Sequence, residues 1–193
     1  SSGYVITGYI GDIDMSKMQK NAALLRSKYK KKYNNIIALY DTSAFYDLFF
    51  SLELLNELLK VVMSVAAKSN SLEILKTKFD SDYYRKSVHN YSNNLIFDSE
   101  KGSLIPALAA DVVIGIEGST PIALSAQYNK RVINFYPTKS AWKYRKLNAF
   151  KDIDMVDSLE FLDVSLLKKL NIRDEINSNM IVTPFIDGKS QFR

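Results

Sequence analysis

Short apolar runs rich in β-branched residues alternate along this chain with longer stretches of helical spacing. This alternation favours an α/β fold, because parallel strands are joined by crossover helices. We therefore expect a Rossmann-like, doubly wound parallel sheet of about six strands with helices on both faces. The predicted strands span 4–7, 36–40, 72–75, 95–97, 111–116 and 131–135. The predicted helices span 16–32, 51–68, 80–90, 104–110, a stretch that opens at 121, and 158–170.

Two of the predicted helices have a clear apolar face. In the first, Ser16 is the expected N-cap. The stretch 138–154 lacks periodicity, so we expect an irregular surface segment there. The expected buried stripe of the first helix is Met18, Ala22, Leu25 and Tyr29. The expected buried face of the long helix is Leu55, Leu58, Leu59, Val62, Val65 and Ala66.

The length of the chain limits how many domains it can form. Its 193 residues suffice for one sizeable core at roughly 100–200 residues per domain. No linker or repeat divides the sequence, so we expect residues 1–193 to form a single domain. A two-domain enzyme with a cleft between equal halves does not fit in this length. A function that needs such a cleft makes the chain a fragment of a larger enzyme.

Composition excludes several classes of chemistry. The absence of cysteine rules out disulfides and thiolate catalysis. No apolar run approaches the roughly 20 residues of a membrane span, and the cytoplasm is the expected location.

The densest basic run, Lys28 and Lys30 to Lys32, ends a predicted helix, where cations complement the helix dipole. We expect a solvated helix end and no nucleic-acid binding there, with a nucleotide or anionic lipid as the alternative partner.

The strongest candidate site is the loop that contains Glu117, Gly118, Ser119 and Thr120, between a predicted strand and a predicted helix. In open parallel sheets, ligands bind beyond the carboxyl ends of the strands. Glycine permits close approach, two hydroxyls donate hydrogen bonds, and a helix N-terminus attracts anions, which together suit a phosphate. Glu117 repels phosphate and suits sugar hydroxyls. The alternative is that a hydroxyl of this loop merely caps the helix.

Two further loops are expected at the same edge of the sheet. Ser43 belongs to a hydroxyl cluster at 41–43, while Lys76 and Lys78 supply cations for a phosphate or carboxylate. The alternative for either lysine is an exposed charge at a strand end.

His89 is the only histidine and is expected at the surface or in a cap, so no metal site is expected. Walker and G-x-G-x-x-G motifs are absent.

Residues 109–135 carry the most specific motif of the chain. They have the pattern A-D-x-x-I-G, S-T-P, A-L and K-x-V-I, with Asn129 where a glycine is common. This block resembles the donor-binding, C-terminal domain of GT-B glycosyltransferases of the bacterial surface-carbohydrate type. The stretches 36–43 and 72–79 resemble the start of the same domain, with Lys-Thr-Lys where the family often has K-P-H-P. The tail 183–193 is similar to the D-P-F-x-D-G-K ending of capsule and lipopolysaccharide biosynthesis proteins.

The resemblance implies the nucleotide-sugar-binding domain of a glycosyltransferase in bacterial surface polysaccharide biosynthesis. A nucleotide sugar is then the substrate, with no separate cofactor and no metal. The acceptor is a glycan or a lipid-linked glycan, which brings the enzyme to the inner membrane face as a peripheral protein. The catalytic base belongs to an N-terminal acceptor domain outside this chain. The implied donor-site residues are Ser43, Lys76, Lys78, Ser119 and Thr120 at the phosphate, with Gly118 in the loop and Glu117 at the sugar or ribose.

Two alternatives stay open. UDP-N-acetylglucosamine 2-epimerases and CDP-glycerol glycerophosphotransferases are similar in the same half, so the resemblance sets the ligand class more firmly than the reaction. The other alternative is a non-catalytic α/β regulatory or binding module, in which Asp41 at a strand end would serve as a phospho-acceptor. A nucleotide requirement separates the enzymes from the module.

Overall fold

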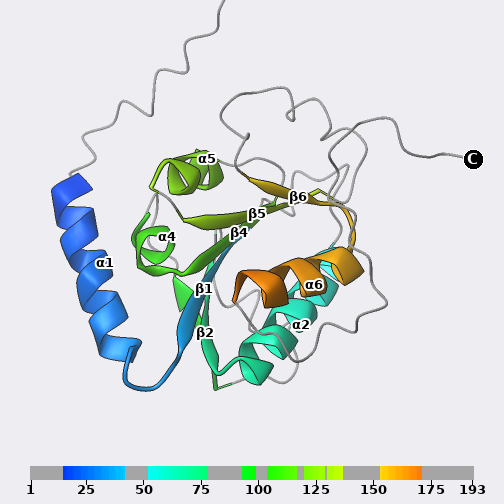
Figure 1. Ribbon diagram of the computed structural model, residues 1–193, viewed down its shortest axis with the longest axis horizontal. Coiled ribbons are helices and arrows are strands. Elements are labelled where there is room, and N and C mark those ends of the chain that lie inside the picture. The colour runs from blue at the N-terminus through cyan, green and yellow to red at the C-terminus, as the bar shows by residue number, and fades with distance from the viewer. Residues whose placement is uncertain are drawn as a thin grey trace, which may run out of the picture.

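The sheet of this protein is open and entirely parallel (Figure 1). The computed structural model describes residues 15–41, 52–77, 93–98, 104–116, 120–128, 130–136 and 153–170. Within them, six strands have the order β3-β2-β1-β4-β5-β6. This order confirms the predicted Rossmann-like α/β fold. The strands are β1 (Asn35–Tyr40), β2 (Ser71–Lys76), β3 (Leu95–Asp98), β4 (Val112–Ile116), β5 (Arg131–Phe135) and β6 (Asp154–Val156).

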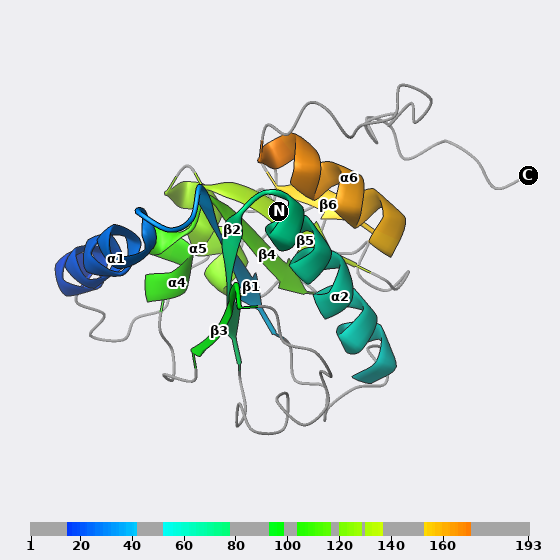
Figure 2. The same cartoon turned by 90° about the horizontal axis from the view of Figure 1, so that it is seen from below.

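Helices cover both faces of the sheet, as predicted for a doubly wound domain. The helices α2 (Leu52–Lys68) and α6 (Leu159–Lys169) lie side by side on one face. On the other face lie α4 (Ile105–Ala109) and α5 (Thr120–Gln127), with α1 (Met15–Tyr29) packed against α4 (Figures 1 and 2). None of the described helices combines the length and the apolar character that crossing a bilayer requires.

The central strands are buried on both faces, which explains their near-continuous apolar sequences. In β1, Ile37 and Leu39 belong to the core under α2 and α6, whereas Ile36 and Ala38 belong to the core under α4 and α5. The long helix packs as its periodicity predicts, since every residue of its expected apolar face is buried in the first of these cores: Leu55, Leu58, Leu59, Val62, Val65 and Ala66.

Short polar sequences fix where two helices begin and end. After α2, Asn70 adopts a left-handed conformation with φ 46°, a conformation that asparagine tolerates better than most residues. The hydroxyl of Ser69 donates to the carbonyl of Val65 at 2.6 Å, and the same carbonyl accepts from the Ser69 amide at 2.9 Å, so both groups bind the last turn of α2. At the start of α6, Ser158 is the N-cap and its side chain accepts a hydrogen bond from the amide of Phe161.

One local prediction is wrong, and one strand was not predicted. Ser16 is not an N-cap, because α1 already begins at Met15, and its exposed side chain is tolerated within the helix. The strand β6 was not expected at the end of the irregular stretch 138–154. It has three residues, too few for a periodicity signal, and it is held by pairing with β5 through Asn134 and Met155. The predicted strand 4–7 and helix 80–90 lie outside the described residues.

Candidate functional site at the carboxyl edge of the sheet

The strand order reverses between β1 and β4, which lie side by side although two strands separate them in the sequence. Ligands of open α/β sheets bind beyond the carboxyl ends of the strands at such a switch point. The predicted loops follow β2, β1 and β4, which are three adjacent strands. The cross-strand pairs of Tyr40 with Lys76 and with Gly115 place the ends of these strands level with one another. The topology therefore brings the predicted loops to one edge.

Only two of the predicted site residues, Lys76 and Thr120, lie in the part of the chain that the structure describes. Lys76 is the last residue of β2, and Thr120 is the first residue of α5, the helix that follows β4. The strand β1 lies between β2 and β4 in the sheet. His89 lies outside the described part of the chain. So do the remaining predicted site residues, which are Ser43, Lys78, Glu117, Gly118 and Ser119. Their roles stay predictions.

A row of polar residues crosses the sheet at this edge. It runs along cross-strand pairs and on the face covered by α4 and α5. The row one step earlier on the same face is wholly apolar and consists of Val132, Val113, Ala38, Ile74 and Ile96. The sheet thus changes from apolar to polar at its last row before the loops. We call this row the polar row; it consists of Asn134, Gly115, Tyr40, Lys76 and Asp98.

The side chain of Lys76 is held where β2 and β3 end, at the carboxyl edge of the sheet. Lys76 is only 7% exposed, and its Nζ donates to the carbonyl oxygens of Thr77 at 3.4 Å and Asp98 at 3.3 Å. These carbonyls offset part of the cost of burying a cation. These contacts place the side-chain nitrogen of Lys76 beside the switch point.

Tyr40 joins the polar row to α4. Its hydroxyl oxygen accepts a hydrogen bond from the amide of Ala107 at 3.1 Å. Burial raises the pKa of Tyr40 far above its ordinary value; the Ala107 hydrogen bond opposes this increase and the nearby Asp98 carboxylate adds to it. The phenol is therefore neutral at all physiological pH values. Its hydrogen bond to Ala107 therefore serves to position α4 against β1.

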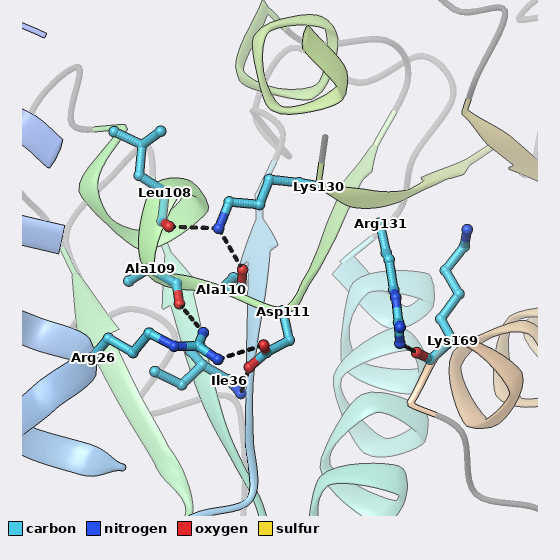
Figure 3. A network of polar contacts seen from close by, with 9 residues as sticks. All are labelled: Arg26, Ile36, Leu108, Ala109, Ala110, Asp111, Lys130, Arg131 and Lys169. Atoms are coloured by element: carbon cyan, nitrogen blue, oxygen red, sulfur yellow. Dashed lines mark hydrogen bonds and ion pairs between the residues drawn. The ribbon is translucent and has the colours of Figure 1, made fainter. Parts of the chain in front are cut away.

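The opposite, amino edge of the sheet holds a second polar cluster, drawn in Figure 3. Asp111 accepts hydrogen bonds from the guanidinium of Arg26 at 2.6 Å and from the amide of Ile36 at 2.9 Å. Arg26 also donates to the carbonyl oxygen of Ala109 at 2.8 Å. One carboxylate thus links α1, the start of β1 and the start of β4.

Lys130 completes this cluster by binding the end of α4. Its Nζ donates to the carbonyl oxygens of Leu108 at 2.7 Å and Ala110 at 3.0 Å (Figure 3). Burial lowers the pKa of Lys130, the charge of Arg26 lowers it further, and Asp111 opposes both effects. A cation at a helix C-terminus stabilises the last carbonyls.

The block of sequence that carries the glycosyltransferase resemblance therefore divides between the two edges. Asp111 and Lys130 belong to it and make structural contacts at the amino edge. From its Ser/Thr part, Thr120 begins α5, which follows β4. Sequence reasoning missed Tyr40, Asp98 and Asn134 as members of the candidate site. The available signal is a polar residue at or near the end of an apolar strand, repeated in several strands.

The comparisons with family models and with curated proteins add no relative. No protein-family model matches the chain, and no curated protein matches it with a significant similarity in sequence.

Proposed function

We propose that this chain is the nucleotide-sugar donor-binding domain of a glycosyltransferase. The observation that carries the proposal is the switch point between β1 and β4, with the three predicted polar loops following three adjacent strands. In sheets of this order the crevice at the switch point is the usual place for a nucleotide. The polar row and the side-chain nitrogen of Lys76 beside the switch point support an anionic, hydrogen-bonding ligand at the same edge.

In the proposed complex the phosphate of the nucleotide lies at the N-terminus of α5. Free amides of the first helical turn and the hydroxyls of Ser119 and Thr120 donate to its oxygens. Lys76 and Lys78 supply positive charge, and Ser43 approaches from the loop after β1. These groups stabilise the charge that develops on the nucleotide as the glycosidic bond to the sugar breaks. Glu117 accepts hydrogen bonds from hydroxyls of the sugar or ribose.

The test is a calorimetric titration of the chain with CMP, UDP, GDP and CDP. We expect saturable binding of one of them. The double variant Ser119→Ala/Thr120→Ala removes two hydrogen bonds to a charged group, so its affinity falls at least about tenfold. The matched control is Ser16→Ala/Ser27→Ala, which deletes two exposed hydroxyls of α1 and leaves the affinity unchanged. A folded chain that binds none of the four nucleotides contradicts the proposal and favours the regulatory module.

A further inference from the structure

The positive charge of this protein is concentrated in one segment. Residues 15–34, which we call the basic segment, comprise α1 and the turn after it. This segment contains seven Lys and Arg residues and no Asp or Glu. The whole chain has 26 basic and 21 acidic residues, which leaves 19 basic against 21 acidic elsewhere. The net charge of +5 therefore originates in the basic segment alone.

Most of this charge faces away from the domain. Arg26 is the inward member, since it pairs with Asp111 at the amino edge. By contrast, Lys17, Lys20, Leu24 and Lys28 are all exposed. They are three or four residues apart, so they lie along one face of α1. The exposed residues Lys30, Lys31 and Lys32 extend the positive surface beyond the helix end.

An apolar side chain lies in the middle of this basic face. Leu24 is 61% exposed, more than the other exposed large hydrophobic residues of the described chain, Tyr128 at 40% and Phe161 at 42%. The apolar stripe on the other side of α1 is already used, because Leu25 and Tyr29 pack against the core under α4 and α5. Leu24 therefore lies outside the packed stripe of α1.

Several anionic partners bind lysines, but they differ in whether they also accommodate an exposed leucine. A nucleic acid supplies phosphates and no apolar phase for an aliphatic side chain. A bilayer surface supplies anionic headgroups for lysines and acyl chains for an inserted leucine. We propose that the exposed face of α1 and the turn 30–32 dock this protein on a membrane surface rich in anionic lipid. The docking is peripheral and reversible, and it does not depend on the proposed nucleotide site.

The helix α1 lies across the sheet from α2 and α6 (Figure 2). A control variant can therefore remove the same number of lysines from the opposite side of the sheet. The triple variant Lys20→Gln/Lys28→Gln/Lys31→Gln removes three exposed lysines from the basic segment. The matched variant Lys60→Gln/Lys68→Gln/Lys168→Gln removes three exposed lysines from α2 and α6. Both lower the net charge by the same amount.

The experiment is flotation of the full chain with vesicles of phosphatidylcholine, with and without about 30% phosphatidylglycerol. We expect binding to the anionic vesicles only, and release at about 0.5 M salt. Each lysine removed from the docking face weakens partitioning about fivefold, so the triple variant binds on the order of 100-fold less. The α2/α6 variant keeps most of its binding. Equal losses in both triple variants would reduce the effect to net charge and overturn the proposal.

A second measurement tests the part played by Leu24. The chain has no cysteine, so Leu24→Cys provides a single attachment point for an environment-sensitive fluorophore. Its emission should rise on anionic vesicles, while that of Phe161→Cys on α6 should not. A short DNA duplex in the same assay tests the other anionic partner. Stronger binding to the duplex than to the vesicles, with no change in the emission of the label at position 24, overturns the proposal in favour of nucleic acid.

Discussion

Glu73 is an ionisable residue in an apolar place. It lies in the middle of β2, is 0% exposed, and neither of its carboxyl oxygens has a hydrogen-bond partner. Its cross-strand neighbours are Ile37 and Leu95, and the ionisable side chains of the facing helix α2 are exposed to solvent. Burial therefore raises the pKa of Glu73 to about 8. The side chain is mainly protonated at neutral pH.

This burial makes stability depend on pH with a defined sign. The folded state holds the Glu73 proton up to about pH 8, whereas the unfolded chain releases it near 4.5. The contribution of the protonated side chain is thus complete below pH 4.5 and is lost as the pH rises to 8. The slope is at most about 1.4 kcal/mol for each pH unit. We expect Glu73→Leu to remove this loss, so that it stabilises the protein most at alkaline pH.

Urea unfolding of both proteins at several pH values between 5 and 8.5 checks this expectation. Glu73→Gln is the matched control, because it removes the titration and keeps a buried polar group. Both variants should flatten the profile, and only the leucine should raise stability throughout. Parallel profiles for the wild type and Glu73→Leu would show that Glu73 does not titrate in this range.

At the scale of elements, α4 shows how a very short helix is kept in place. It has five residues, too few to be stable alone. Pro106 lies in its first turn, where the missing amide is harmless. The Tyr40 hydroxyl accepts from the amide of Ala107 at one end, and Lys130 donates to Leu108 and Ala110 at the other. Contacts from β1 and from the residue before β5 thus hold both ends.

We expect Lys130→Met to destabilise the protein by about 1–3 kcal/mol, because two carbonyls at the end of α4 lose their donor. Thermal unfolding measures the loss. Lys168→Met on the exposed side of α6 is the control and should change stability by less than about 0.5 kcal/mol. An equal effect of both substitutions would refute the capping role of Lys130.

Elements with strong periodicity could be predicted from sequence, whereas contacts between distant strands could not. The helix 51–68 was predicted with all its buried residues, because six apolar side chains repeat on one face. The predicted strand 131–135 matches β5. The polar row was not predicted, since it depends on the registers of β1 with β2 and with β4, which no local pattern encodes. For the same reason Lys76 was predicted as a site cation without its carbonyl partners on Thr77 and Asp98.

On the scale of the whole molecule, the two edges of the sheet have separate tasks. The amino edge is held by Asp111, which links α1, β1 and β4, while the carboxyl edge carries the candidate site. Damage at the first edge should therefore leave ligand binding at the second unchanged, as long as the domain remains folded.

The variant Asp111→Ala tests this separation. We expect a loss of about 1–3 kcal/mol, because the amide of Ile36 loses its acceptor and Arg26 loses its partner. Asp111→Asn keeps an acceptor for the amide and should lose less. Urea unfolding gives the stabilities, and the calorimetric titration gives the nucleotide affinity, which should match that of the wild type in both variants. A weakened nucleotide affinity in folded Asp111→Asn would mean that the two edges are coupled.

Among the described residues, the strands become shorter toward both borders of the sheet. The central strands β1 and β2 have six residues each, whereas the border strands β3 and β6 have four and three. A border strand exposes unpaired amides and carbonyls to any extended peptide that meets it, and short borders give such a peptide little to pair with. In the part of the chain that the structure describes, the tapered sheet therefore offers such a peptide short borders, and substitutions that lengthen β3 or β6 should make edge-to-edge pairing easier.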